Sequence, residues 1–100
     1  MKNYILSLTE LAKEDMRIGQ EFYESQSENL GDYFIDSILM DLESLKFYAG
    51  IHAQQFGYYK MLSKRFPFAI YYDIEDDVVV VHAIFDSRQN PLLAEMRLKR

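Results

Sequence analysis

The spacing of apolar residues changes near the middle of the chain, and this change separates a helical first half from a strand-forming second half. From about residue 10 to residue 48, apolar side chains recur at intervals of three and four, the period of amphipathic helices. Beyond Gly57 the interval falls to two, the period at which side chains alternate across a strand. A short apolar run at Lys2–Leu8 precedes the helical segment and predicts an opening strand.

The helical half predicts two helices, Glu10–Ser25 and Asn29–Tyr48, joined by the polar break Ser25–Asn29. Thr9 is suited to cap the first helix, and so short a break predicts an antiparallel hairpin. The apolar face of the first helix consists of Leu11, Ala12, Met16, Ile18, Gly19, Phe22 and Tyr23, and that of the second consists of Leu30, Phe34, Ile38, Leu42 and Leu45. We expect the pair to pack on a sheet through five of these residues, Met16, Phe22, Phe34, Ile38 and Leu42.

The second half predicts three strands, Tyr58–Leu62, Phe66–Ile74 and Val78–Phe85, with an acidic turn at Glu75–Asp77 between the last two. Val78–Phe85 is β-branched and apolar on both faces, so we place it at the centre of the sheet. Two tyrosine pairs, Tyr58 with Tyr59 and Tyr71 with Tyr72, should face each other across adjacent strands. The last segment, Leu92–Arg100, is either a short basic helix or a tail.

The predicted order β-α-α-β-β-β belongs to the α+β class, with an N-terminal strand and an antiparallel two-helix hairpin packed on one face of a small, mostly antiparallel sheet. One hundred residues are expected to form a single domain, 1–100, and the hydrophobic fraction of 49% excludes intrinsic disorder. There is no cysteine and there are only two histidines, which argues against disulfides and against thiolate or histidine-rich metal sites. Neither a signal peptide nor a membrane-spanning stretch is predicted, so we expect a cytoplasmic protein without a cofactor, a metal or a membrane partner.

Charge is distributed unevenly along the chain. Residues 1–50 carry 4 basic and 10 acidic side chains, a net charge of −6, whereas residues 51–100 carry 7 basic and 6 acidic side chains, a net charge of +1. Neutralisation of phosphates supplies most of the affinity of nucleic-acid binders, so this balance excludes a general nucleic-acid-binding protein. Any role in binding anions is therefore confined to the second half.

Four cations of the second half are the candidates for chemistry, namely Lys60, Lys64, Arg65 and Arg88. If the strand that holds Lys60 stays regular, Lys64 shares its face, and Arg88 follows a neighbouring strand. Such a cluster could stabilise the charge that develops on a scissile phosphate in metal-free cleavage of RNA. The alternative, which the acidic balance favours, is that these side chains are solvated or contact a partner protein.

His82 lies among valines in the third predicted strand. A histidine of suitable pKa could serve as a base in RNA cleavage. We favour a hydrogen-bonded core residue instead, because no partner acid lies at a recognisable spacing.

Three segments carry a resemblance to a known family. The first is LTELAKED at Leu8–Asp15, which contains an A-x-x-D entry into the first helix. The second and most specific is YKMLSKRFPFAIYY at Tyr59–Tyr72, and the third is DSRQNP at Asp86–Pro91. Together with the order of elements, this pattern resembles the RelE/ParE superfamily of type II toxin–antitoxin toxins over nearly the whole chain. The resemblance implies the RelE/ParE-like fold.

The departures from the family pattern indicate which branch is closer. Family members usually have a histidine where Asp86 stands, and the mRNA-cleaving branch is generally basic and often carries a catalytic tyrosine in its C-terminal segment, whereas no tyrosine follows Tyr72 here. These points favour the ParE-like branch. The resemblance then implies a plasmid-stabilisation type toxin that inhibits growth by binding a cellular target such as DNA gyrase, without making or breaking a bond, and that a cognate antitoxin neutralises.

Two alternatives stay open. One is a ribosome-dependent mRNA endonuclease acting on ribosome-bound mRNA, with catalytic residues among Lys60, Lys64, Arg65 and Arg88. The other is a degenerate family member without toxicity. For the favoured branch, the expected antitoxin- or target-binding residues are Lys60, Lys64, Arg65, Arg88 and Arg97. The sequence leaves open whether the protein is a homodimer or part of a toxin–antitoxin hetero-oligomer.

Overall fold

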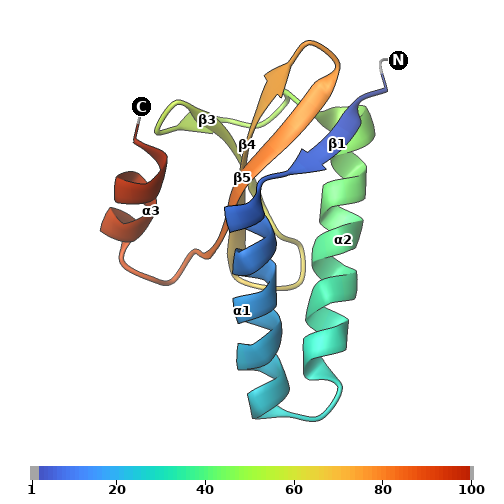
Figure 1. Ribbon diagram of the computed structural model, residues 1–100, viewed down its shortest axis with the longest axis vertical. Coiled ribbons are helices and arrows are strands. Elements are labelled where there is room, and N and C mark those ends of the chain that lie inside the picture. Colours follow the sequence, from blue (N-terminus) through green and yellow to red (C-terminus); the bar gives the residue numbers. More distant parts are fainter. Residues whose placement is uncertain (1–2, 100) are drawn as a thin grey trace.

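The computed structural model describes residues 3–99 (Figure 1). In chain order its elements are β1 (Ile5–Leu8), α1 (Glu10–Gln26), α2 (Leu30–Tyr48), β2 (Gln54–Gln55), β3 (Tyr58–Leu62), β4 (Phe68–Glu75), β5 (Val78–Asp86) and α3 (Pro91–Leu98). The helical hairpin and the three predicted later strands are confirmed, and the last segment is a helix. Lys2 is the first residue of the predicted opening strand, and Arg100 is the last residue of the predicted C-terminal segment. Both lie outside the described residues.

The differences at element ends have local causes. The β4 strand begins at Phe68 rather than Phe66, because Pro67 has no N–H for a ladder and the Phe68 N–H turns back to the Phe66 carbonyl at 2.7 Å. The two-residue strand β2, which pairs Gln54 and Gln55 with β3, was not predicted. Its two glutamines show no alternation of apolar and polar residues from which a strand could be predicted.

The described strands form a five-stranded sheet in the order β1-β5-β4-β3-β2. The β1 strand runs parallel to β5, and the other neighbours are antiparallel. As predicted, β5 is an interior strand, although β4 occupies the middle position. The parallel pairing extends only from Ile5 opposite Val78 to Leu8 opposite Val81, so β5 continues for five residues beyond the end of β1.

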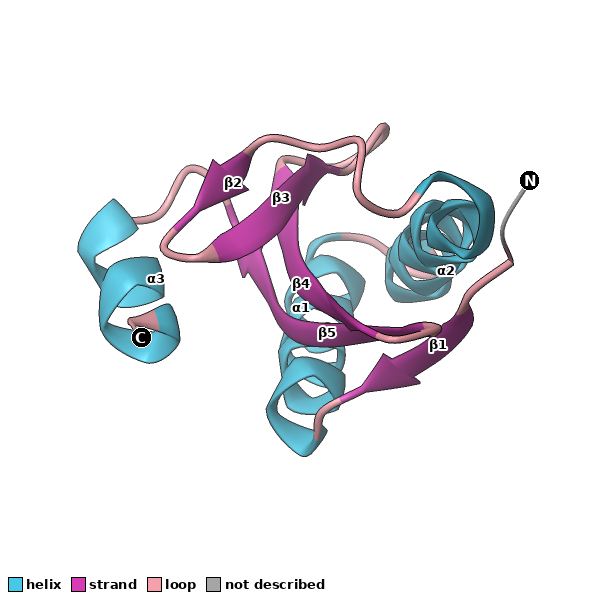
Figure 2. Ribbon diagram, turned by 90° about the horizontal axis from the view of Figure 1, so that it is seen from above, coloured by secondary structure: helices cyan, strands magenta, loops and turns pink. Residues whose placement is uncertain are grey.

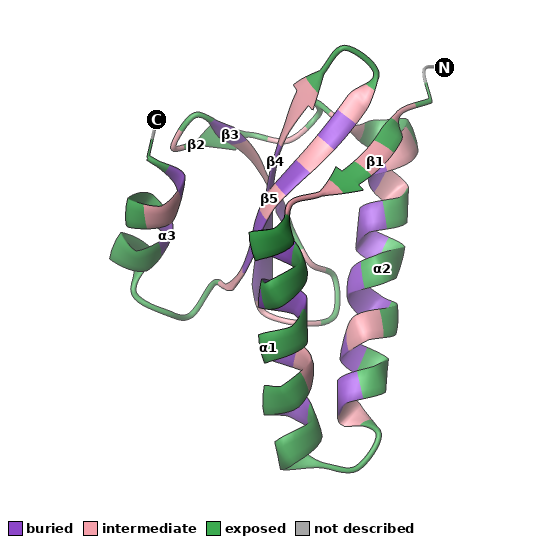
Figure 3. Cartoon of the chain, viewed as in Figure 1, coloured by how far each residue is buried: buried purple, intermediate pink, exposed green. Residues whose placement is uncertain are grey.

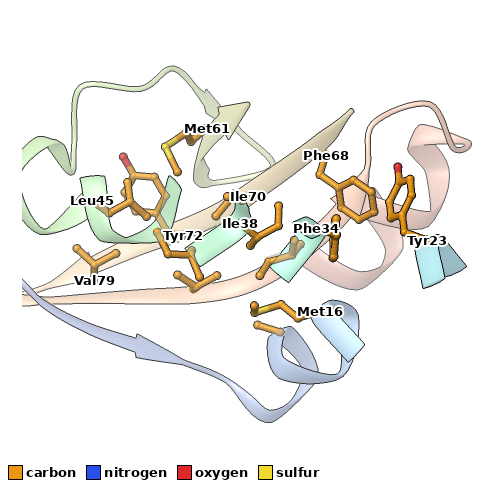
Figure 4. Packing of buried hydrophobic residues seen from close by; sticks show 14 residues of the cluster. Met16, Tyr23, Phe34, Ile38, Leu45, Met61, Phe68, Ile70, Tyr72 and Val79 are labelled. Carbon is orange, nitrogen blue, oxygen red and sulfur yellow. The ribbon is translucent and has the colours of Figure 1, made fainter. Parts of the chain in front are cut away.

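The helices α1 and α2 lie side by side and cover one face of the sheet, whereas α3 lies on the other face (Figures 1 and 2). Thr9 caps α1, its hydroxyl accepting the Ala12 N–H at 3.1 Å. Phe34, Ile38 and Leu42 of α2 are fully buried in a core that they share with residues of β4 and β5, and Met16 of α1 is 9% exposed. Figure 4 shows Phe34, Ile38 and Met16 in this core. Four of the five residues predicted to pack on the sheet therefore do so.

The fifth, Phe22, does not pack there, and the prediction for it was wrong. Its side chain is 51% exposed, and Leu11 and Ile18 of the same predicted face are more exposed still. The apolar residues of α1 form two stripes rather than one. The stripe that contains Met16 and Gly19 faces α2 and the sheet, and the stripe of Leu11, Ile18 and Phe22 points outward from this packing (Figure 3). A single helix face cannot bury both stripes, because they are about 100° apart around the helix axis.

Gly19 sets how closely the two helices approach. A Cβ at this position would lie 2.6 Å from Cζ of Phe34, far inside the contact distance of two carbons. The ring of Phe34 therefore occupies the space that a side chain on α1 would need. It also packs against Tyr23, Phe66 and Phe68, with ring centroids 4.9–5.1 Å away.

A β-bulge in β5 changes which side chains face the helices. Tyr72 pairs with Val81 and Tyr71 pairs with Ala83, so His82 is an extra residue opposite β4. Before the bulge Val79 and Val81 face the helical hairpin, and after it Ile84 does. Ala83 consequently faces the opposite side, where it joins a smaller core of Tyr58, Ala69, Tyr71, Ala94 and Leu98 under α3.

Candidate functional site

The four cations singled out from the sequence do not share one face. The β3 strand ends at Leu62, so the alternation that begins at Lys60 does not reach Lys64. The Lys60 ammonium lies 5.9 Å from the centroid of the Tyr71 ring, on the α3 side of the sheet. The Arg65 guanidinium lies 3.7 Å from the Met40 sulfur of α2, on the other side. Lys64, like Arg65, is an exposed residue of the β3–β4 connection.

Arg88 forms an ion pair with Asp86. Its Nε and Nη2 donate to the two oxygens of that carboxylate at 3.0 and 2.8 Å, and its backbone N–H donates to Oδ1 at 2.8 Å. The guanidinium lowers the pKa of Asp86 below its ordinary value. The charge of Arg88 is thus compensated within the chain, although the side chain stays 61% exposed.

Arg97 forms an ion pair with Asp15 within the chain. Its Nη1 and Nη2 donate to the two oxygens of Asp15 at 2.8 and 2.9 Å, and Nη2 also donates to the His82 carbonyl at 3.0 Å. Asp15 accepts a third hydrogen bond, from the Ile84 N–H at 2.9 Å. Burial raises the pKa of Asp15 despite these donors. The pair joins α3 to α1 around the edge of β5, where β1 has ended.

His82 has the acidic partner that the sequence did not reveal. Its Nε2 lies 3.1 Å from Oδ1 of Asp73, and its ring packs against Tyr58 with centroids 4.9 Å apart. The side chain is 28% exposed, so His82 is hydrogen-bonded and partly buried. Asp73 is nine residues away in sequence but adjacent across the β4–β5 hairpin. Counting residues outward from the acidic turn pairs Asp73 with Val80, two positions before His82, so the contact between Asp73 and His82 is a diagonal one across the two strands.

The four tyrosines of the predicted aromatic pairs are divided between the two faces of the sheet. Tyr59 and Tyr72 are stacked across β3 and β4 with centroids 5.2 Å apart, as predicted, and face the helical hairpin. Tyr58 and Tyr71 face α3. The Tyr72 hydroxyl accepts the Gly50 N–H at 3.0 Å and lies 2.5 Å from Nδ1 of His52, whose pKa burial lowers. These rings are part of the packing of the domain.

A groove lies between α1 and the end of β5, and sequence reasoning did not find it. Its volume is about 340 Å³. We call it the α1–β5 groove, lined by Asp15, Ile18, Gly19, Phe22, Phe68, Ile84, Phe85, Asp86 and Gln89. Its walls are mainly apolar, and its two carboxylates are paired with Arg97 and Arg88. The groove could have been expected from the number of apolar residues on α1, because this number is larger than one helix face can bury.

Within residues 3–99, no cluster of three or more histidine, cysteine, aspartate or glutamate side chains could hold a metal ion. Nor does any helix in this part of the chain have the length and apolar character needed to cross a membrane.

Comparison with known proteins gives a structural relative and no sequence relative. No protein-family model matches the sequence, and no curated protein matches it. The structure is similar to a chain of the chromosomal ParDE TA system from P. aeruginosa, with a TM-score of 0.70 and 16% sequence identity. The match covers 83% of this chain and 95% of that chain. The two-helix hairpin on a mixed sheet, predicted from the order of elements and the three motifs, is thus confirmed as a RelE/ParE-like α+β fold.

Proposed function

We propose that this protein is the toxin of a type II toxin–antitoxin pair, that it resembles the ParE branch, and that it acts in the cytoplasm by binding a cellular target such as DNA gyrase. The observation that carries the proposal is the fold shared with a chain of the ParDE TA system. A cognate antitoxin is the partner that such a system requires. A role in plasmid stabilisation through growth inhibition in cells that have lost the antitoxin follows from the same proposal.

The placement of the cations favours binding over cleavage. A nuclease needs donors preorganised around one scissile phosphate. Here Lys60 and Arg65 lie on opposite sides of the sheet, and the charge of Arg88 is compensated by Asp86. We therefore assign Lys60, Lys64, Arg65 and Arg88 to contacts with the antitoxin or the target and not to chemistry. Arg97, 21% exposed and paired with Asp15, would support such contacts by holding α3 in place.

The test is induction of this chain in bacteria, alone and together with the product of any short reading frame that adjoins its gene. The chain alone should slow growth, and co-expression should restore it and yield a complex that can be purified. In purified assays the chain should inhibit DNA supercoiling by gyrase, while translation of a reporter mRNA continues.

Each contrary result selects another function. Cleavage of mRNA in the ribosomal A site that is lost in Arg88→Ala would establish the endonuclease alternative. A complex with the neighbouring product, without any effect on growth, would identify a degenerate family member that retains the antitoxin interface. If growth is inhibited but gyrase is unaffected, the protein is a toxin whose target is not gyrase.

A further inference from the structure

The outer side of α2 exposes a row of apolar side chains. Tyr33, Met40 and Phe47 are 49%, 59% and 50% exposed. They are seven residues apart, an interval close to two helical turns, so they lie in one line along the helix. Exposed residues recur along this side of α2 (Figure 3). We call these three residues the α2 row. Contiguous apolar surface of this kind marks sites where a partner binds.

Two carboxylates lie between the members of the α2 row. Asp36 follows Tyr33 by three residues, and Glu43 follows Met40 by three. Row and carboxylates together give the alternation of three and four residues by which one helix packs along another in a coiled coil. Both carboxylates are exposed, and the ion pair of Glu43 with Lys46, at 2.9 Å, is a surface pair that contributes little.

The β3–β4 connection lies along one flank of the α2 row. Its Arg65 guanidinium lies 3.7 Å from the Met40 sulfur, and its Ser63 hydroxyl donates to Asp41 at 2.6 Å. Asp41 is about 100° around the helix axis from Met40 in one direction, whereas the two carboxylates between the row residues are about 40–60° from it in the other. Lys64 and Arg65 are exposed. The row therefore has cations on one flank and carboxylates on the other.

This distribution of charge does not suit a second copy of the chain. Parallel pairing of two α2 helices would place Asp36 and Glu43 opposite their own counterparts. Antiparallel pairing about a two-fold axis would place the carboxylate flank of one copy against the same flank of the other. Both arrangements bring like charges together and remove water from them, which is unfavourable. A helix with cations at the facing positions would compensate the carboxylates instead.

We propose that the α2 row is the docking site for an α-helix of the cellular target, one whose apolar side chains recur every seven residues with lysine or arginine side chains between them. This inference rests on the proposed function for the existence of that target. It also deepens the assignment of Lys64 and Arg65, because these cations would face acidic residues on the far flank of the docked helix. The charges would fix its register and orientation, while the apolar row supplies most of the binding energy.

The experiment measures how much of the full chain is needed to halve the growth rate of bacteria under graded induction. Met40→Glu and Phe47→Glu place a carboxylate in the α2 row. Met96→Glu on α3 and Phe22→Glu on α1 are matched controls, because Met96 and Phe22 are 72% and 51% exposed and lie outside the row. The row variants should require at least tenfold more protein, and the controls should stay within twofold of the unmodified chain. All four should unfold at temperatures close to that of the unmodified chain, because the replaced side chains are half exposed or more.

Two substitutions of Asp36 test the charge of the docked helix. Asp36→Lys opposes its cations and should weaken growth inhibition at least tenfold, whereas Asp36→Asn only removes the attraction and should weaken it about threefold or less. Equal effects of the two substitutions, or stronger inhibition by Asp36→Lys, would overturn the proposed chemistry of the partner.

The row variants are also co-expressed with the product of any short reading frame that adjoins the gene, and they should still form the complex expected of an antitoxin. Loss of that complex in Met40→Glu would assign the row to the antitoxin. Dimers of the unmodified chain in light scattering that dissociate in Met40→Glu would assign it to a second copy. Either result overturns this inference, as does full growth inhibition by both row variants, and each leaves the proposed function standing. If the unmodified chain does not slow growth, the proposed function fails and this inference fails with it.

Discussion

Replacing Arg97 by alanine tests how far the ion pair with Asp15 holds the domain together. Asp15 is 8% exposed and receives two hydrogen bonds from Arg97 and one from the Ile84 N–H. Breaking a buried ion pair typically costs about 3–5 kcal/mol, because the remaining charge is left without its partner. Arg97 is 21% exposed, so water can partly replace it, and we expect a loss of about 2–3 kcal/mol.

A loss of this size is easily measured in a chain of 100 residues. Such domains are stable by only about 5–15 kcal/mol, and each kcal/mol corresponds to roughly 4–8 °C in melting temperature. Arg97→Ala should therefore lower the melting temperature by about 8–24 °C. The assay is urea unfolding followed by circular dichroism, with thermal unfolding in parallel.

A double-mutant cycle separates the ion pair from the loss of packing. Asp15→Ala, Arg97→Ala and the double variant should show a coupling free energy of at least about 1 kcal/mol, because the second substitution removes a charge that the first left unpaired. The exposed pair of Glu10 and Lys13, whose side chains are 90% and 59% exposed, is the control, and Lys13→Ala should leave stability almost unchanged. Additive effects of Asp15→Ala and Arg97→Ala would refute the reasoning.

Three further substitutions probe the packing and the charges. Gly19→Ala should destabilise the protein by about 1–3 kcal/mol, because the added Cβ clashes with Phe34. At an unhindered helical glycine the same substitution would stabilise the protein by about 0.5–1 kcal/mol, so the sign of the change in urea unfolding distinguishes the two cases. Tyr72→Phe should cost about 1–3 kcal/mol, because the Gly50 N–H loses its acceptor, and an unchanged urea midpoint would contradict this. The pKa of Asp86 in the folded state lies below its ordinary value of 3.8. The ion pair of Asp86 therefore stabilises the fold above pH 3.8, and this stability is lost as the pH falls through the pKa of the folded state. In acid titrations the stability difference between the unmodified chain and Asp86→Asn should therefore shrink below pH 3.8, and a constant difference would count against the ion pair.

The sequence by itself determined the elements and their order, because these follow from local periodicity. Intervals of three and four defined both helices, and the β3 strand was predicted with its observed bounds. The burial of Phe34, Ile38 and Leu42 followed from one stripe on α2. A β-branched run with no polar face was enough to place β5 inside the sheet.

Tertiary structure alone decided which of the two stripes on α1 is buried. Leu11, Ile18 and Phe22 are as apolar as the residues that pack, and only the position of α2 and the sheet beside α1 leaves them outside. Their spacing could be read from the sequence, but their exposure could not, because it depends on elements distant along the chain. The α1–β5 groove follows from that placement.

The same reason explains the polar contacts that the sequence did not reveal. Asp15 meets Arg97 across 82 positions, and it reaches the Ile84 N–H only because β1 ends before β5 does. The extra residue at His82 reverses the alternation of β5, so the faces of Ala83 and Ile84 cannot be counted from Val79. Periodicity describes neighbours along one element, whereas the length of a paired strand and the position of a bulge are set by pairing between elements.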